Sequence, residues 1–466
     1  MLQAWHDPER LELLRGTPVN CLIVDWAAGQ PDDLAQQTSL LPFIKAGRER
    51  GISFVGEVLG KGVEEQAIPA GLQAGLSAVR LEEPPTRPYT LPVILRSPRS
   101  KVPWNSNFPL LSITENHWPG TGMTTMHGDV AIAGPTGVPW VDSNGWFLLQ
   151  AHQLGKGKTF WMEIDPPDSL PAHDSPNYCL AVADCQVYGS RWVIALDDNL
   201  KLGMMRKDSK ATRLWERLVA TVSFFKEHED WGRFQPAASL AVTSDFRGED
   251  EDFAGEVLNL LSRRHVQYKI IERSRILSSS LEGLKALAWV DTAEPNSESR
   301  AMLFAFARRG GLLVASPSWG VSEGHVVGSD FSDRYELRTV GLGRVAVAKQ
   351  EWQDPYQVAG DIHLMLSRRN DLVRLYNPGT TNCYCSFDPT SPTGLVQILD
   401  YSPSGTTDFV TLWTQVRNRS ARLWTLDAKH PIDLAGSSAE EAVEFNLPDF
   451  SLYLALEFQS GVSEWK

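Results

Sequence analysis

The N-terminal part of the chain alternates between short apolar runs that end in an acidic residue and stretches with helical character. NCLIVDW (20–26), ISFVGEV (52–58) and SAVRLEE (77–83) are the first three runs. Continuous apolar strands separated by helices are typical of a parallel sheet that is covered on both faces. The pattern therefore predicts an α/β domain. Further apolar runs that look like strands follow at residues 91–97, 109–116, 159–165 and 191–198.

About seven strands suit a closed or partly closed (β/α) barrel, although the span is shorter than the roughly 250 residues typical of that fold. Between residues 91 and 113 two strands follow one another without a clear helix, so one or two barrel helices are expected to be missing. We therefore expect a degenerate (β/α)8-like barrel over residues 1–206. A doubly wound open sheet is the alternative.

The rest of the chain shows two further patterns. Residues 207–330 begin with a long amphipathic helix and then alternate strands with helices such as SESRAMLFAFARRG, which predicts a Rossmann-like, amidotransferase-like α/β domain. Residues 331–466 hold short strands, starting with RVAVAKQEW (344–352), that are separated by turn clusters such as NPGTTN and SPSG. Such spacing without helices indicates an antiparallel β-sandwich.

Composition and missing motifs exclude several functions. The net charge is −13 with no long Lys/Arg run, which argues against nucleic-acid binding. No apolar run approaches a membrane span, and the N-terminus lacks the apolar core of a signal peptide. We expect a soluble protein, either cytoplasmic or exported with a leader that has been removed. No HExxH motif or GxGxxG turn supports a metal or another cofactor, and no Cys lies between Cys185 and Cys383 to serve amidotransferase chemistry.

Acidic residues at strand ends are the main catalytic candidates. In a barrel the active site lies at the carboxyl ends of the strands. Glycoside hydrolysis needs two carboxyl groups, roughly 5–5.5 Å apart for retention of configuration and 6.5–9.5 Å apart for inversion. An acid at a strand end also commonly caps a helix or closes a turn, and that reading stays open for each residue. The acids expected on this face are Asp25, Glu57, Glu82 or Glu83, Glu115, Glu163, Asp165 and Asp197.

Aromatic and amide side chains in nearby loops are candidates for sugar binding. The stretch GPTGVPWVDSNGW (134–146) places two Trp beside a carboxylate and an amide, and an indole beside hydrogen-bonding groups suits the face and edge of a sugar. Asp142 or Ser143 also suits the N-cap of the helix that follows, and each Trp also suits simple packing. The candidates are Trp104, Trp118, Trp140, Asp142, Asn144 and Trp146, together with Asp25 and Glu82.

The three-part order resembles multidomain glycoside hydrolases of the β-galactosidase type. The strand ends VDW, GEV, LEE and MEID carry this resemblance, as do the segment FARRGGLLVASPSWG and the sandwich that begins at DLVRLYNPG. The resemblance implies a barrel, an amidotransferase-like domain and a sandwich, with a catalytic carboxyl pair. No Asn-Glu-Pro motif occurs, and ITEN (113–116) is the nearest analogue by position.

Two functions from different classes remain. One is a glycoside hydrolase that acts on a carbohydrate substrate with catalytic carboxyls among Glu163, Glu115 and Glu57. The other is a non-catalytic glycan-binding or scaffold protein that keeps the architecture without the pair. A different barrel hydrolase or lyase is a third, weaker possibility. The middle domain and the sandwich could mediate a homo-oligomer.

Overall fold

The computed structural model describes residues 6–122, 125–127, 130–132, 140–167, 177–402, 409–440, 442–460 and 465. By their contacts the residues form two compact units, which are treated separately below. Unit 1 comprises Met1–Asn116, Gly155–Asp174 and Ser190–His228. Unit 2 comprises His117–Leu154, Ser175–Gly189 and Glu229–Lys466. Each unit is thus assembled from three separate stretches of the chain.

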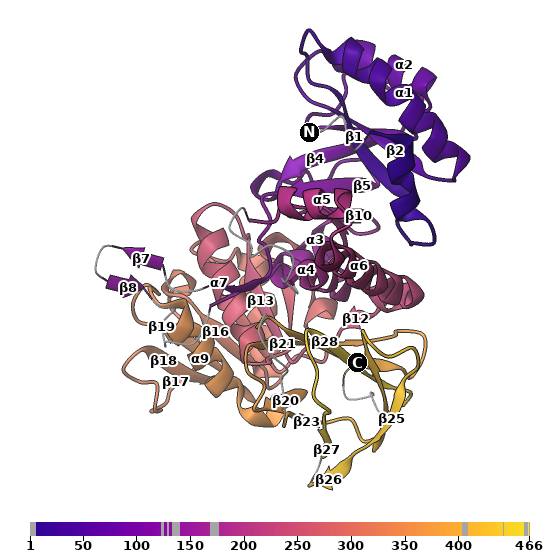
Figure 1. The fold of residues 1–466 in the computed structure, drawn as a ribbon. Coiled ribbons are helices and arrows are strands. Elements are labelled where there is room, and N and C mark those ends of the chain that lie inside the picture. Colours follow the sequence, from indigo (N-terminus) through magenta and orange to yellow (C-terminus); the bar gives the residue numbers. More distant parts are fainter. Residues whose placement is uncertain are drawn as a thin grey trace. The chain divides into compact units, whose positions relative to one another are not determined.

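Unit 1 is built on a seven-stranded parallel sheet with the order β1-β2-β3-β4-β5-β10-β11 (Figure 1). This order follows the chain, as in a barrel, whereas a doubly wound sheet reverses direction at a switch point. Among the described strands β1 pairs only with β2, and β11 only with β10, so the sheet is an open half-barrel. The strands are β1 (Cys21–Ala27), β2 (Ser53–Val58), β3 (Ala78–Leu81), β4 (Val93–Pro98), β5 (Leu110–Thr114), β10 (Thr159–Glu163) and β11 (Arg191–Val193).

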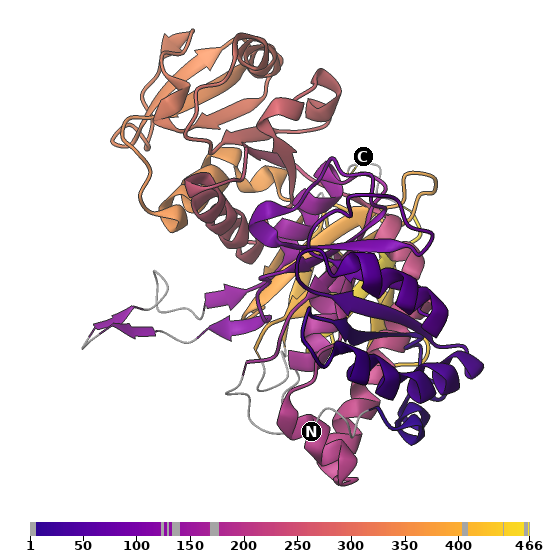
Figure 2. The same ribbon diagram turned by 90° about the horizontal axis from the view of Figure 1, so that it is seen from above.

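Helices α1 (Asp33–Glu49) and α2 (Glu64–Ala74) lie on one side of β1 and β2 in both ribbon views (Figure 1; Figure 2). The buried positions of α1 are Leu40, Phe43, Ile44 and Gly47, a spacing that places them on one helical face. Gly47 permits close packing, because a Cβ there would lie 2.4 Å from the ring of Phe54. Two more helices follow in this unit, α5 (Asp198–Met205) and α6 (Ser209–Glu227).

The opposite face of this sheet has an apolar layer and a charged layer. Val55, Ala78 and Ile94 form a small buried cluster there. Side chains alternate along a strand, so residues two positions further on share the same face. Glu57 therefore follows Val55 on this face, and Arg80 follows Ala78. The strand sequences thus place charges at the carboxyl ends of the strands.

Unit 2 contains a seven-stranded α/β sheet with the order β14-β13-β15-β16-β19-β18-β17. The strands from β14 to β19 in this order are parallel, and β18 and β17 are antiparallel additions. Its helices are α7 (Glu249–Arg263), α8 (Ser297–Arg308) and α9 (Pro355–Leu366). Its strands are β13 (Leu240–Ser244), β14 (Tyr268–Glu272), β15 (Ala286–Trp289), β16 (Leu312–Ala315), β17 (His325–Val326), β18 (Tyr335–Val340) and β19 (Gly343–Ala348).

Two features of unit 2 correct the sequence-based interpretation. The run at 344–352, expected to begin the sandwich, forms β19, which pairs in parallel with β16 and belongs to the α/β sheet. Helices α3 (Gly145–Leu154) and α4 (Asn177–Val187), expected to cover the barrel, belong to unit 2. There α3 packs against β14 and α7, and α4 packs against β22. Both helices are buried along most of their length, so no single apolar face in the sequence identifies their partners.

The C-terminal sandwich has two antiparallel sheets with the orders β12-β21-β22-β28-β24-β25 and β20-β23-β27-β26. Its apolar core includes Cys385, Ile398, Phe445 and Leu454. The first sheet holds β12 (Gln235–Pro236), β21 (Thr381–Phe387), β22 (Gly394–Asp400), β24 (Ser420–Thr425), β25 (Ile432–Ala435) and β28 (Tyr453–Phe458). The second holds β20 (Val373–Tyr376), β23 (Thr411–Thr414), β26 (Ser437–Ala439) and β27 (Ala442–Asn446).

Two short antiparallel pairs also lie in unit 2. Strand β6 (Gly120–Gly122) pairs with β9 (Trp140–Asp142), and β7 (Thr125–His127) pairs with β8 (Val130–Ile132). Among the described residues, no helix is both long enough and apolar enough to cross a membrane.

Candidate active site

A network of charged side chains lies on the inner face of the half-barrel in unit 1. Arg80 on β3 contacts two glutamates: its Nη1 lies 2.8 Å from Glu163 Oε1, and its Nη2 lies 2.5 Å from Glu57 Oε1. Arg96 on β4 places its Nε 3.0 Å from Glu163 Oε2 and its Nη1 2.9 Å from Glu82 Oε1. Two guanidinium groups therefore connect three carboxylates.

Strand register explains why these residues meet. In the parallel sheet Glu57 lies beside Arg80, and Arg96 lies beside Ser112, so these side chains share one face. Glu163 closes the network from β10, where the Ser112 hydroxyl donates to its Oε1 at 2.6 Å. Among the described residues, the partners of the Glu57 and Glu163 carboxylates are all side chains, and they come from three strands, β3, β4 and β5.

The network is largely removed from solvent. The side chains of Arg80, Glu163 and Glu57 are only 6%, 12% and 14% exposed. Burial alone lowers the pKa of Arg96, but the carboxylates of Glu163, Glu57 and Glu82 outweigh burial and raise this pKa. Arg96 therefore stays charged at the centre of the three carboxyl groups.

Glu115 lies at the carboxyl end of β5, next to β10. Its side chain is exposed, and its backbone has φ = 63°, a left-handed conformation that a residue with a Cβ rarely adopts. The neighbouring Asn116 Nδ2 donates to the carbonyl of Ile113 at 2.7 Å and to the carbonyl of Glu163 at 3.1 Å. These bonds tie the turn that carries Glu115 to the end of the strand that carries Glu163.

The other predicted residues of unit 1 lie around this network. Asp25 on β1 is the register neighbour of Glu57 and is exposed. Glu82 is half exposed and joins the network through Arg96. Trp104 is partly buried and packs edge-on against Phe160, with the ring centroids 6.2 Å apart. Asp197, in contrast, caps α5 by accepting the Leu200 amide at 2.9 Å.

The remaining predicted binding residues lie in unit 2. Asn144 is fully buried, where its Nδ2 donates to the His117 carbonyl at 2.8 Å and to Asp184 Oδ2 at 2.9 Å. Tyr401 completes this buried network by donating to Asp184 Oδ1 at 2.6 Å. Asn144 thus ties the start of α3 to α4 and to the end of β22.

The predicted tryptophans of unit 2 differ in what surrounds them. Trp146 is 8% exposed and contacts Phe147 and Phe246. Trp118 meets Tyr178 edge to face at 5.2 Å between ring centroids. Trp140 begins β9, and its side chain lies outside the described residues, as do residues 133–139.

Asp142 lies close to a second carboxyl that the sequence did not reveal. Burial raises the pKa of Asp142. Burial is also the main cause that raises the pKa of Glu256 on α7 to about 8, and the charge of Asp142 adds to this shift. Asn259, one turn along α7, donates to the Val141 carbonyl at 2.8 Å. Strand β9 and helix α7 are therefore joined beside two carboxyl groups, and negative charge on both of them at once is unfavourable.

Sequence reasoning missed the cations of both α/β sheets. Arg80 stands in the apolar run AVRL and Arg96 in VILRS, and a charge inside a buried strand is the signal that marks them.

In unit 2 Asp245, Asp250 and Asp291 bring carboxylate oxygens within 4.8 Å of one another, a spacing that suits a metal ion. Arg273 already contacts Asp245 at 3.0 Å and Asp291 at 2.6 Å. The acidic cluster therefore has a cation of its own.

A parallel half-barrel, an α/β sheet and an antiparallel sandwich define an α/β plus β architecture. No family model and no curated protein matches the sequence. Among solved structures the chain is similar to α-L-fucosidase isoenzyme 2 from Paenibacillus thiaminolyticus. The TM-score is 0.62 at 10% identity, and the alignment covers 98% of this chain and 96% of that one.

Two other solved structures align with lower scores. The exo-β-1,4-mannosidase Op5Man5 from Opitutaceae bacterium strain TAV5 has a TM-score of 0.47 at 12% identity, covering 75% of this chain and 88% of that one. A β-galactosidase from Bacillus circulans sp. alkalophilus has a TM-score of 0.37 at 11% identity, covering 91% and 66%. The fucosidase alignment shows that this chain shares the overall fold of that structure over nearly its whole length.

Proposed function

We propose that this chain is a glycoside hydrolase whose reaction takes place at the inner face of the half-barrel, with Glu163 and Glu115 as the carboxyl pair. One observation carries the proposal. The Glu163 carboxylate is fixed by Arg80, Arg96 and Ser112, and the turn that holds Glu115 is bonded to the Glu163 backbone. Two carboxyls on adjacent strand ends are what glycoside hydrolysis requires.

The two carboxyls have different surroundings, which suits two different roles. Three charge-assisted contacts hold Glu163 in one position, as a nucleophile or a group that stabilises a cationic transition state requires. Glu115 is exposed and meets solvent, as a group that exchanges protons with the leaving oxygen and with water requires. Glu57 on the far side of Arg80 would position that guanidinium.

Three residues of the same unit are assigned to substrate binding. Asp25 and Glu82 offer exposed carboxylates to sugar hydroxyls, and Trp104 offers an indole that could stack on a sugar ring. Because the aligned structure with the TM-score of 0.62 is named an α-L-fucosidase, α-L-fucosides are the first substrates to try.

The test is hydrolysis of a panel of aryl glycosides and natural oligosaccharides by the parent and by Glu163→Gln and Glu115→Gln. Turnover should fall on the order of 10³-fold in Glu163→Gln and on the order of 10²-fold in Glu115→Gln, in line with the loss of a catalytic carboxyl. Aryl glycosides with good leaving groups should partly spare Glu115→Gln, since they need less protonation. Glu83→Gln is the control. Glu83 is exposed, and among the described residues its ion-pair partner is Lys61, which lies outside the charged network. Equal turnover in all variants would exclude this pair.

The alternative is a glycan-binding protein without turnover. The ion pairs of Glu57 and Glu163 with Arg80 and Arg96 favour this alternative. Each of these two carboxylates already contacts a guanidinium group. No hydrolysis of any substrate, with saturable sugar binding that survives Glu163→Gln and Glu115→Gln, would favour this function.

A further inference from the structure

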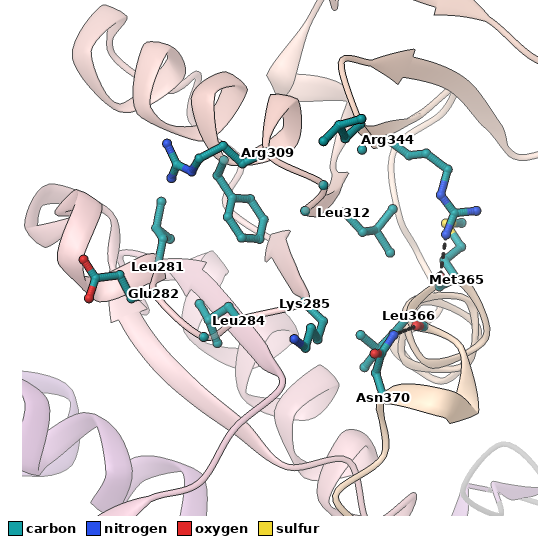
Figure 3. A pocket seen from close by; sticks show the side chains of 16 residues that line it. Leu281, Glu282, Leu284, Lys285, Arg309, Leu312, Arg344, Met365, Leu366 and Asn370 are labelled. Carbon is teal, nitrogen blue, oxygen red and sulfur yellow. Dashed lines mark hydrogen bonds between the residues drawn. The ribbon is translucent and has the colours of Figure 1, made fainter. Parts of the chain in front are cut away.

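Unit 2 gathers ionisable side chains at two places besides its cluster of three aspartates. One is a pocket of about 520 Å³ whose lining includes Lys285, Arg309 and Arg344 (Figure 3). The guanidinium groups of the two arginines point away from each other in Figure 3, so they do not face one ligand. The other place is the contact between β9 and α7, where the carboxyl groups of Asp142 and Glu256 act on each other.

Strand β9 is held on α7 by buried hydrogen bonds. Asn259 Nδ2 donates to the Val141 carbonyl at 2.8 Å, and the Ser143 hydroxyl donates to Asn259 Oδ1 at 3.4 Å. Both ends of the Asn259 amide thus bind the residues on either side of Asp142. Glu256 lies three positions before Asn259, and residues three apart are neighbours on a helix. The two carboxyl groups therefore belong to the same contact as these hydrogen bonds.

The surroundings of Glu256 favour its neutral form. Its Oε1 is buried and has no hydrogen-bond partner among the described residues. An ionised carboxylate with an unpaired buried oxygen costs more free energy than the neutral acid. Burial accordingly raises the pKa of Glu256 to about 8, and the charge of Asp142 adds to this shift. Asn259 and Arg263 favour the ionised form but do not outweigh burial.

Helices α3 and α9 and strands β13 and β21 also pack against α7. On α3, burial lowers the pKa of His152, so this ring stays neutral at neutral pH. Strands β13 and β21 carry no Asp, Glu, Lys, Arg or His. The ionisable residues of α9 have partners of their own: Tyr356 lies under Arg264, Asp361 pairs with Arg334, and His363 pairs with Asp371. The charges that act on Glu256 are therefore those of β9 and of α7 itself.

The base of the β6–β9 hairpin is held by a different contact. Asn144 Oδ1 accepts the amide of His117 at 3.0 Å, and Asn144 Nδ2 donates to the His117 carbonyl at 2.8 Å. Asp184 in turn holds Asn144. None of these bonds involves Glu256 or Asp142. Strand β9 can therefore leave α7 while the base of the hairpin stays in place.

We propose that Asp142, Glu256 and Asn259 form a pH-sensitive latch that holds β9 on α7 while Glu256 keeps its proton. Glu256 is partly exposed, so water can take this proton. The ionised Glu256 is a second negative charge beside Asp142, and the repulsion between the two weakens the hold of β9 on α7. The latch is closed in acid and opens as pH rises toward the mildly alkaline range.

Hydrogen exchange of the full chain, followed by mass spectrometry at about pH 5.5 and about pH 8.5, tests the latch. After correction for the intrinsic pH dependence of exchange, the peptide that covers β9 should exchange about tenfold faster at the higher pH, the effect of a shift of one pKa unit. Peptides from α8 should keep their protection. Equal protection of β9 at both pH values would overturn the inference. An equal loss of protection over α8 would show global unfolding and would also overturn it.

Variants on both sides of the contact sharpen the test. Glu256→Gln should remove the pH dependence of β9 exchange, because the amide keeps the shape and does not ionise. Asp142→Asn should reduce it, because one of the two charges is lost, and this variant decides alone if Glu256→Gln does not fold. Asp252→Asn is the control, since Asp252 is exposed on the same helix, and it should behave as the parent. Thermal unfolding at mildly acidic pH checks that each variant is folded. Full pH dependence in both Glu256→Gln and Asp142→Asn, or an equal loss of it in Asp252→Asn, would contradict the latch.

Discussion

The two parallel sheets of this chain each carry a cluster of carboxylates and arginines at their strand ends, and different partners hold the two clusters. In unit 1 the described partners of Glu57 and Glu163 are all side chains, from strands β3, β4 and β5 of the same sheet. In unit 2 Asp291 accepts the backbone amides of Asp245 and Ala293, both at 2.7 Å. An acid that binds backbone amides shapes the loops around it. An acid that binds only side chains does not hold a loop in place. The carboxylates of unit 1 are therefore better candidates for chemistry than those of unit 2.

The largest contrast is expected between Asp291→Asn and Glu57→Gln. Asp291 is fully buried and contacts two amides and Arg273, so Asp291→Asn should lower the free energy of unfolding by about 3 kcal/mol. Glu57→Gln keeps its shape and leaves Glu163 beside Arg80, so it should cost only about 1 kcal/mol. Urea unfolding of both variants measures this difference.

Activity should show the reverse order. Turnover per folded molecule should be unchanged in Asp291→Asn and should fall about tenfold in Glu57→Gln, because Arg80 loses one of the carboxylates that orient it. Similar stability losses in the two variants would remove the distinction between the clusters.

Glu256 on α7, which belongs to neither cluster, is expected to make the free energy of unfolding depend on pH, with an effect of intermediate size. Burial raises its pKa from 4.5 to about 8, so between these pH values the folded chain holds a proton that the unfolded chain has released. Stability from this group is therefore full below pH 4.5 and falls as pH rises toward about 8. Glu256→Gln should reduce the fall in unfolding free energy between mildly acidic and mildly alkaline pH by about 2 kcal/mol.

Asp252→Asn is the control for this effect, since Asp252 is exposed on the same helix. Unfolding curves at several pH values give the comparison. A parallel pH dependence in the parent and in Glu256→Gln would assign the change to other groups.

The smallest expected effect comes from the backbone of Glu115. Glycine adopts a positive φ at no steric cost, so Glu115→Gly should raise the free energy of unfolding by about 0.5–1 kcal/mol while it lowers turnover. Lys207, with φ = 55° and an exposed side chain in the same unit, is the control. Lys207→Gly should give a similar gain in stability with unchanged turnover. A gain in stability without loss of activity in Glu115→Gly would separate the strain from function.

The sequence predicted the strands of the half-barrel well because each lies in a short apolar run, and most of these runs end in an acid. It failed for α3 and α4, since a helix that is buried on all sides gives no sign of which neighbour it packs against. It also placed β19 in the sandwich, because pairing with β16 joins residues that lie far apart in the sequence. Local patterns specify an element, but long-range pairing specifies its neighbours.

The same limit applies to the candidate site. Glu57 and Glu163 were found as strand-end acids, whereas Arg80 and Arg96 were missed because their role depends on the register between strands. Asn144 was read as a ligand-binding amide from its loop, yet the structure bonds it to Asp184, forty positions along the chain. No short window of sequence contains both partners of such a contact.

The interleaving of the two units has a consequence for biosynthesis. As the chain leaves the ribosome, β1 to β5 emerge first, but β10 and β11 emerge only after α3 has been made. Helices α3 and α4 must then wait for β14 and β22, which are translated much later. Their buried apolar surfaces are exposed during that interval and are a natural substrate for chaperones. A truncated chain that ends after α6 would keep these two helices without their partners, so neither unit is a simple N- or C-terminal fragment.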